Sequence, residues 1–359
     1  MYRGVKFDYK FHPSIFLLKM LINNYGLAFI DGSWLLTRNL YITTKDKTIE
    51  EMNPADTVRL TLQTISKLSK SWGITAQKII IIWDKWSKIY GGYIRSWMLK
   101  DFVTYKGSRK FITERVLEEM KNDTNVTPEQ LNAAMRELAI SKIKFKAKDI
   151  MINEFPKIGI CSYFYEGYEF DDIASLASFQ LYRDSGLPNI IITKDSDLQY
   201  STCPNCVWMC PPSGGATEPT IITYNDMYYK IPEALRNRGM SLYNYNAYMN
   251  AAGFIGHNDM GISKKRNTDS VETILKILDG DYSDLHNKDM FEAQLKSYDL
   301  SLFPGINIVR QDIDNFYSMG HYGTLNDFHE FCMKNGITQI SDNYYTNMIS
   351  KFDQKLFSH

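Results

Sequence analysis

Carboxylates crowd into one short segment of this chain, immediately before an apolar stretch. The segment Tyr165–Phe179, YEGYEFDDIASLASF, carries Glu166, Glu169, Asp171 and Asp172 within seven residues. One or two such acids have an ordinary explanation, because an acid at a helix start caps unpaired N–H groups and interacts favourably with the helix dipole. Four acids exceed that need, which predicts that some of them do chemistry.

Other acids follow short apolar runs that are typical of strands. Gly26–Ile30 is followed by Asp31, Lys78–Trp83 by Asp84, and Asn189–Thr193 by Asp195 and Asp197, while Ile158–Tyr165 leads into the acidic segment. The runs are β-branched and barely alternate, which predicts strands buried on both faces of a parallel sheet. Helical patterns, Ala55–Ser71 among them, lie between the runs, so the chain is expected to have an α/β fold.

The strand-end acids are expected to meet, because ligands of open parallel sheets bind beyond the carboxyl ends of the strands. Two carboxylates about 4 Å apart repel by roughly 4 kcal/mol at an effective dielectric of 20. Mg²⁺ and Mn²⁺ take carboxylate oxygens and offset that repulsion, and two such ions promote phosphodiester hydrolysis. For a single Asp, a cap or turn role is the commoner alternative. For the whole set we favour metal binding: Asp31, Asp84, Glu169, Asp171, Asp195 and Asp197.

A basic and aromatic stretch, residues 85–110, comes directly after Asp84. Its cations suit phosphates and its aromatic rings suit stacking on bases; an amphipathic surface helix is the alternative. A second basic stretch, Ser141–Asp149, favours a solvated helix face at the end of a helix that starts at Thr127-Pro128. In residues 253–278, two helical patterns flank a turn with Lys264, Lys265 and Arg266, which predicts contact with a nucleic-acid backbone.

These motifs together resemble the 5′-nuclease family, which includes flap endonucleases and the 5′-nuclease domains of bacterial polymerases. The likeness is greatest to the RNase H-type 5′→3′ exonucleases and flap endonucleases of T-even phages. The motifs are FIDGS, IIWD, YKGSR, GYEFDD, KDSDL and IGHNDMGI, in the family's order, and the resemblance runs weakly to the C-terminus.

The resemblance implies a PIN-like α/β core with a helical arch and a helical subdomain that contains a helix–three-turn–helix. The expected domains are residues 1–235, catalytic, with the arch at about 86–150, and residues 236–359, helical and DNA-binding. The implied ligands of two Mg²⁺ or Mn²⁺ ions are Asp31, Asp84, Asp171 and Asp195 for the first, and Glu169, Asp197 and Asp259 for the second, with Asp172 as a further candidate. The basic and aromatic stretch after Asp84 offers Arg95, Lys100, Tyr105, Lys106 and Arg109 as DNA contacts, and the turn in residues 253–278 offers Lys264, Lys265 and Arg266. The resemblance implies that Lys106 and Arg109 lie on the arch and contact the scissile phosphate, and that the segment around Gly256–Arg266 grips the duplex backbone.

Two motifs depart from the family's pattern. The family often has G-D-x-x-D, whereas here Gly256 is followed by His257 and Asn258 before the single Asp259, which removes one acid of the second metal site. The usual Gly-Ile-Gly-x-Lys turn is also altered at residues 261–265. The tail segment Gln354–Phe357 resembles sliding-clamp peptides, but an ordinary helix-end role for Phe357 is the favoured interpretation.

Composition narrows the class of protein. The 359 residues are 44% hydrophobic and carry 41 basic and 41 acidic side chains, so any nucleic-acid binding must come from local patches. No apolar run is long enough for a membrane span. The five cysteines fit a reducing compartment, and we expect a cytoplasmic monomer, in the host cytoplasm if phage-encoded. Cys203 and Cys206 are half of a zinc pattern; a turn between strands is the favoured alternative.

The leading hypothesis is a metal-dependent 5′-nuclease that acts on DNA flaps, nicks or RNA primers in replication or repair, with a sliding clamp or single-strand-binding protein as a candidate partner. A single-strand or RNA 5′-exonuclease on the same core is a second hypothesis. A phosphatase of the haloacid-dehalogenase type is disfavoured, because Ser33 stands where the second Asp after Asp31 is needed. A non-catalytic junction-binding protein is a fourth hypothesis. The acids disfavour it, because carboxylates that no cation neutralises would repel DNA.

Overall fold

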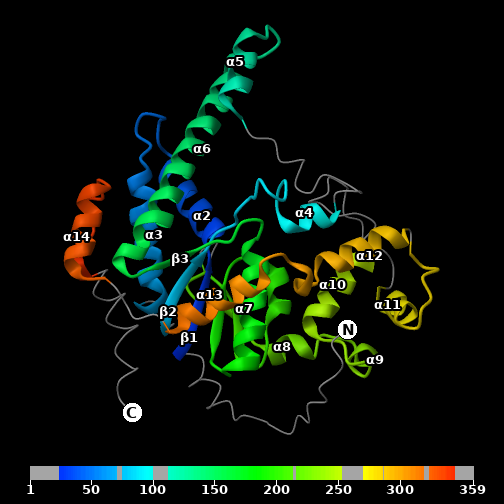
Figure 1. The fold of residues 1–359 in the computed structure, drawn as a ribbon. Helices are drawn as coiled ribbons and strands as arrows, with labels where there is room; N and C mark the ends of the chain where they lie inside the picture. Colours follow the sequence, from blue (N-terminus) through cyan, green and yellow to red (C-terminus); the bar gives the residue numbers. More distant parts are fainter. Residues whose placement is uncertain are drawn as a thin grey trace, which may run out of the picture. The chain divides into compact units, whose positions relative to one another are not determined.

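A computed structural model describes residues 24–70, 75–99, 112–212, 216–252, 270–285, 287–318 and 323–343. Its centre is a six-stranded sheet in the order β3-β2-β1-β4-β5-β6 (Figure 1). The strands are β1 Asn24–Asp31, β2 Thr75–Ile82, β3 Cys161–Tyr163, β4 Asn189–Ile192, β5 Cys206–Cys210 and β6 Thr220–Ile222. β2 pairs with β3 and β4 with β5 in parallel, whereas β6 runs antiparallel to β5. The predicted α/β fold is confirmed, with an antiparallel strand at one edge.

The strands lie where the apolar runs predict them because their side chains are almost fully buried. All four residues of β4 are buried, and Ile80, Ile81 and Ile82 of β2 are at most 1% exposed. Such burial on both faces removes the inside–outside alternation of a half-exposed strand. The acids that follow these runs therefore come at the points where β1, β2 and β4 end.

Helices occupy most of the remaining described chain. The α-helices are α2 Gly32–Thr44, α3 Pro54–Lys70, α4 Ile94–Leu99, α5 Glu114–Asn122, α6 Pro128–Glu154, α7 Phe170–Asp184, α8 Tyr224–Tyr228, α9 Glu233–Arg236, α10 Leu242–Ala252, α11 Ser270–Leu278, α12 Lys288–Ser297, α13 Ile306–Ser318 and α14 Leu325–Lys334. Short 3₁₀ helices are η1 Phe155–Ile158, η2 Ser196–Ser201 and η4 Leu300–Leu302. Among the described residues, no helix combines the length and apolarity that a membrane crossing needs.

The chain divides into two compact units. Unit 1 comprises Met1–Phe29, Asp84–Ser108 and Tyr165–Tyr317, and unit 2 comprises Ile30–Trp83, Arg109–Phe164 and Ser318–His359. The expected domain boundary between residues 235 and 236 falls inside the third segment of unit 1. The division into a catalytic and a DNA-binding domain stays a prediction.

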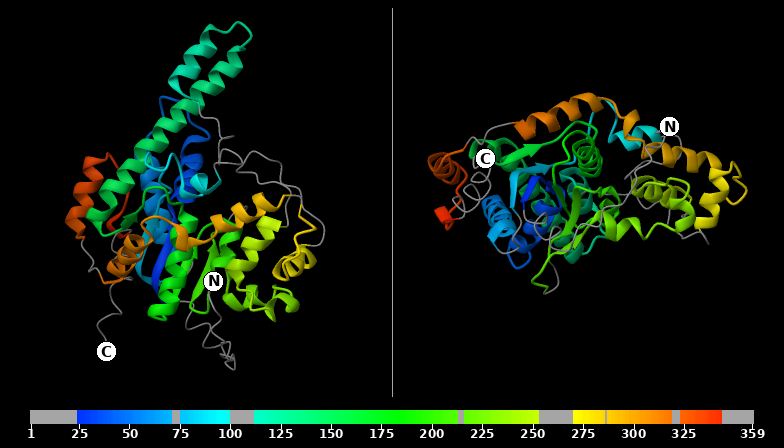
Figure 2. Two further views of the ribbon diagram at one scale, coloured as in Figure 1. Left: turned by 45° about the vertical axis from the view of Figure 1, so that its right-hand side comes forward. Right: turned by 90° about the horizontal axis from the view of Figure 1, so that it is seen from below.

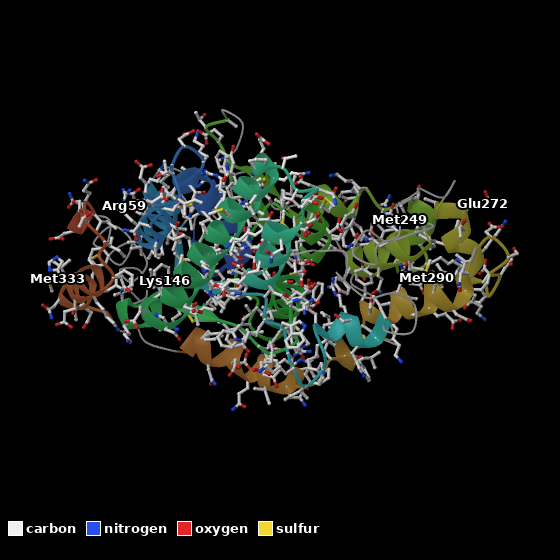
Figure 3. All side chains as sticks on the ribbon, turned by 90° about the horizontal axis from the view of Figure 1, so that it is seen from above. Arg59, Lys146, Met249, Glu272, Met290 and Met333 are labelled. Atoms are coloured by element: carbon white, nitrogen blue, oxygen red, sulfur yellow. The ribbon has the colours of Figure 1, made fainter. Side chains whose placement is uncertain are left out.

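Unit 2 contains a helical hairpin made by α5 and the long helix α6, which lie side by side in Figure 1 and in the left-hand view of Figure 2. Thr127 and Gln130 form a capping box at the start of α6, and Pro128 occupies its first turn. The predicted helix start at Thr127-Pro128 is therefore confirmed. Lys146, labelled in Figure 3, is exposed on α6, as a solvated helix face requires.

Unit 1 contains a second apolar core among its helices. Met227, Leu235, Ile274 and Phe291 are at most 3% exposed in this cluster, and Met249 of α10, labelled in Figure 3, packs against it. The segment that joins α10 to α11, residues 253–269, lies outside the described residues. The predicted helix–three-turn–helix and its Lys264, Lys265 and Arg266 therefore stay predictions.

Candidate active site

The acidic segment after β3 forms a tight loop and the first turn of α7. The N–H of Glu169 donates to Asp172 Oδ2 at 3.0 Å, and the two residues form a capping box around the start of the helix. Both side chains are buried, with Glu169 at 4% and Asp172 at 1% exposure. Two of the four crowded acids therefore have a structural role in ending the loop and starting the helix.

Backbone hydrogen bonds hold this loop against the segment that follows β2. The Gly167 N–H donates to the Lys85 carbonyl at 2.8 Å, and the Lys85 N–H donates to the Tyr168 carbonyl at 3.1 Å. The Ile94 N–H, at the start of α4, donates to the Gly167 carbonyl at 2.6 Å. Gly167 has φ +87°, a region that favours glycine. The segment containing Asp84 and the acidic loop are thereby fixed to each other.

Asp84 lies close to the start of α7. Its Oδ1 accepts a hydrogen bond from the Phe170 N–H at 2.8 Å. A carboxylate at this place satisfies one of the unpaired N–H groups of the helix and interacts with the positive end of its dipole. A strand-end acid and the acidic segment therefore come together, although they are far apart in the sequence.

Several charged side chains affect the ionisation of the Asp171 carboxyl group. Burial raises the pKa of its carboxyl group well above the usual range, and the charges of Asp195, Glu169 and Asp84 raise it further, while Arg95 opposes them. Part of the residue surface remains exposed, but the surroundings of the carboxyl group are largely protein. Three of the predicted metal-binding acids therefore lie within electrostatic reach of the Asp171 carboxyl group.

Asp195 is held by its own turn after β4. Its side chain accepts the Asp197 N–H at 3.0 Å and caps η2, and its carbonyl accepts the Trp208 Nε1–H at 3.0 Å. Asp197 follows in the first turn of this 3₁₀ helix and is exposed. Asp195 therefore has the capping role that is the common one for a single Asp. Its charge also raises the pKa of Asp171.

Asp31 is the last residue of β1 and belongs to unit 2. Its Oδ1 accepts the Trp34 N–H at 2.9 Å, so it caps the start of α2. Gly32 comes next, and a Cβ built there would lie 2.7 Å from the Trp83 ring, which no larger residue tolerates. The strand-to-helix turn is therefore built around Asp31, whose role as a metal ligand stays a prediction.

Arg95 on α4 has anionic partners within the protein. Its Nη2 lies 2.7 Å from Asp172 Oδ1, and its Nη1 lies 4.0 Å from Glu169 Oε2. The guanidinium carbon also lies 5.3 Å from the centre of the Tyr298 ring. Neither Tyr298 nor these ion pairs had a local signal in the sequence, because the partners come from segments far apart in the chain.

Several predicted site residues lie outside the described parts of the chain: Lys100, Tyr105, Lys106, Arg109, Asp259, Lys264, Lys265 and Arg266. Their roles in catalysis, metal binding and DNA binding stay predictions. Glu166 is described: its Oε2 accepts a hydrogen bond from the Ser87 hydroxyl at 3.4 Å, which fits a structural role in the loop.

No ready-made metal site is seen: within the described ranges, no three His, Cys, Asp or Glu side chains are grouped closely enough to hold a metal ion. This includes the cysteines of the zinc alternative. Cys203 and Cys206 have free thiols, and their backbones form an isolated antiparallel β-bridge at the turn that leads into β5, as the turn interpretation predicts. The acids around Asp171 supply the oxygen donors that hard cations prefer, but they are spread more widely than a closed ligand set.

Comparisons with known proteins found similarity among solved structures. No family model matches the chain, and no curated protein matches it. The structure of T5 D15 protein co-crystallised with metal ions is 16% identical, with a TM-score of 0.43, over 92% of this chain and 99% of that one. T5 5′-exonuclease with bound zinc ions is 16% identical over the same shares, with a TM-score of 0.42.

A third structure is the bacteriophage T5 D15 flap endonuclease in a pseudo-enzyme-product complex with DNA and metal ions. It is 16% identical, with a TM-score of 0.43, over 92% of this chain and 100% of that one. At 16% identity and TM-scores below 0.5, these likenesses assign no chemistry to this chain. The more specific likeness to T-even phage enzymes stays a prediction.

Proposed function

We propose that this protein is a divalent-metal-dependent 5′-nuclease that hydrolyses phosphodiesters in DNA with a 5′ flap, a nick or an RNA primer. The observation that carries the proposal is that Asp84 reaches the start of α7, where it accepts the Phe170 N–H at 2.8 Å, and that the charges of Asp84, Glu169 and Asp195 all act on the carboxyl group of Asp171 there. Arg95 is the opposing charge among the described residues, and buried carboxyl groups with a raised pKa beside other carboxylates are typical of functional sites.

The donor chemistry of this group fits Mg²⁺ or Mn²⁺. Every side chain in it presents carboxylate oxygen, which hard divalent cations prefer to nitrogen or sulfur. We propose Asp84, Glu169, Asp171 and Asp195 as ligands, with Asp31, Asp197 and Asp259 completing two sites. Asp172, a further candidate from the sequence, is not included, because Arg95 and the Glu169 N–H engage its two oxygens. The described acids do not by themselves form a closed ligand set. When bound, the ions supply Lewis acidity to the phosphodiester.

The residues after Asp84 support binding of a nucleic-acid end. Trp86 is 50% exposed, Ile89 is 81% exposed and Trp97 is 48% exposed, all on the segment that hydrogen bonds to the acidic loop. Exposed aromatic rings stack on unpaired bases with little dependence on sequence. Lys88 is exposed between them and suits a phosphate. Lys106 and Arg109 lie outside the described residues and stay the proposed contacts of the scissile phosphate.

The exposed tryptophans also favour one alternative, a single-strand or RNA 5′-exonuclease that uses the same acids. Stacking needs bases that are already unpaired, whereas grip on a duplex depends on the residues proposed at 261–266. Comparing a 5′-flap, a nicked duplex and a single strand of equal length separates the two substrates. Faster cleavage of the single strand than of the flap would favour the alternative.

The proposal is tested by flap cleavage with Mg²⁺ in the wild type, Asp84→Asn and Asp171→Asn. We expect cleavage that EDTA abolishes and that either substitution reduces by at least about 100-fold. Asp184→Asn is the matched control, because Asp184 is at the other end of α7, exposed and paired with Arg183. Full cleavage by Asp84→Asn would contradict the assignment, and flap binding without cleavage by the wild type would favour a junction-binding protein.

A further inference from the structure

We propose that Arg95 is a positioning residue, which holds the buried carboxylates of Glu169 and Asp172 and thereby fixes the turn of α7 that carries Asp171. The sequence had suggested a different role for it, a contact with DNA phosphate. The inference rests on the proposed function, because this turn is the one proposed to bind metal ions.

The first step is the burial of the ion pairs. The Arg95 side chain is 15% exposed, and its partners Glu169 and Asp172 are 5% and 1% exposed. Water is excluded from most of this contact, so its electrostatic strength is much greater than that of a surface pair. Phosphate would have to displace carboxylates that are already in place.

The second step is the use of both oxygens of Asp172. Oδ1 lies 2.7 Å from Arg95 Nη2, while Oδ2 accepts the Glu169 N–H at 3.0 Å. One carboxylate therefore joins the guanidinium to the backbone of the capping box. Asp171 lies between Glu169 and Asp172 in the chain, so a rotation of this turn changes the direction of its carboxyl group.

The third step is the fixed position of Arg95 itself. It is the second residue of α4, whose first residue is tied to the Gly167 carbonyl through the 2.6 Å bond from Ile94. The Tyr298 ring covers the guanidinium at 5.3 Å, and α4 packs against α12, which ends just before Tyr298. Arg95 is thereby held from the backbone end and from the guanidinium end, as a positioning group requires.

The test uses Arg95→Lys, because removing one partner of a buried ion pair altogether often unfolds a protein. Lysine keeps the charge but lacks the planar fork that reaches two carboxylates. Binding of Mn²⁺ is measured by calorimetry, and binding of an uncut 5′-flap is measured in EDTA at several salt concentrations. Circular dichroism confirms that each variant is folded.

We expect Arg95→Lys to weaken Mn²⁺ binding by about 10- to 100-fold. Flap affinity in EDTA and its dependence on salt should stay within about twofold of the wild type, because no phosphate contact is lost. Lys88→Gln is the matched control: it should weaken flap binding, reduce the salt slope by about 0.7–0.9 and leave Mn²⁺ binding unchanged.

Tyr298 supplies a second pair of variants in case Arg95→Lys does not fold. Tyr298→Leu removes the ring above the guanidinium and should weaken Mn²⁺ binding several-fold, whereas Tyr298→Phe keeps the ring and should not. A reduced salt slope with unchanged Mn²⁺ affinity in Arg95→Lys would overturn the proposal in favour of a phosphate contact. An unchanged Mn²⁺ affinity together with an unchanged salt slope in Arg95→Lys would also overturn the proposal. A wild type that binds no Mn²⁺ at millimolar concentration would overturn the proposed function as well.

Discussion

Replacing Asp171 with asparagine is expected to make the metal-free protein more stable while it destroys the proposed activity. The carboxyl group of Asp171 is disfavoured in its ionised form by burial and then by the charges of Asp195, Glu169 and Asp84, against the single opposing charge of Arg95. Asparagine keeps the shape and size of the side chain but removes the charge. Sites that hold repelling groups for function are regularly less stable than their neutralised variants.

The size of the gain follows from the charges. Two unit charges about 6 Å apart interact by roughly 3 kcal/mol at an effective dielectric of 20. Burial and the charges of three carboxylates disfavour the ionised form of Asp171, the Arg95 charge favours it, and solvent at the partly exposed side weakens all of these effects. We therefore expect the free energy of unfolding in EDTA at pH 7 to rise by about 1–3 kcal/mol.

The pH dependence of this gain has a definite sign. The pKa of Asp171 is higher in the folded state than in the unfolded chain, where it is about 3.9. Its contribution to stability is therefore fully present below pH 4 and is lost as the pH rises through the folded-state pKa. The advantage of Asp171→Asn over the wild type should grow with pH across that range and then level off.

The assay is urea denaturation in EDTA at pH 4 to 8, repeated with Mg²⁺, for the wild type, Asp171→Asn and Asp184→Asn. Asp184 is the control on the same helix, because its hydrogen bonds to Arg183 lower the pKa of its carboxyl group. Its replacement should not stabilise the protein, and its effect should vanish as the pH falls. An unchanged or lower stability of Asp171→Asn in EDTA would refute the crowding on which the site rests.

Further predictions concern residues around the site and the core. The Tyr243 hydroxyl is buried without a hydrogen-bond partner among the described residues, so Tyr243→Phe should raise the free energy of unfolding by about 1 kcal/mol; a loss of that size would contradict this. At Gly167, a Cβ would lie 2.9 Å from the Tyr90 ring, so Gly167→Ala should cost about 2 kcal/mol more in urea denaturation than Gly186→Ala, where φ is also positive but space is open; equal costs would disprove it. Burial raises the pKa of Cys161 to about 12, so about 1 in 10,000 of these thiols is ionised at pH 8. Alkylation of Cys161, followed by mass spectrometry, should therefore be slow at pH 8 and faster at pH 10 in folded protein; rapid labelling at pH 8 would contradict the burial.

The strands of this fold could be predicted because strands buried on both faces consist of short runs of apolar, mostly β-branched residues. The apolar run Gly26–Ile30 lies within β1, and Asn189–Thr193 differs from β4 by one residue at its end. The run Ile158–Tyr165 was predicted as one longer strand, whereas β3 spans only Cys161–Tyr163. Pro156 lies in η1 and Gly159 ends it in a left-handed conformation, so pairing begins later.

The candidate site was predictable only in part. The acids at Asp84, Asp171 and Asp195 could be brought together by topology, because parallel strands end at the same edge of a sheet. The ion pairs of Arg95 could not, since its partners come from a separate segment and no spacing rule connects them. Composition alone had placed Arg95 among the phosphate contacts, because a basic residue among aromatic residues is typical of such surfaces.

The central claim is that divalent ions occupy the space among these carboxylates. Crystals soaked in Mn²⁺ test it most directly, because the anomalous signal of manganese locates each ion without reference to activity. The account predicts manganese peaks in contact with Asp84, Asp171 and Asp195. A well-ordered site without manganese at millimolar concentration, or manganese bound only elsewhere, would contradict it.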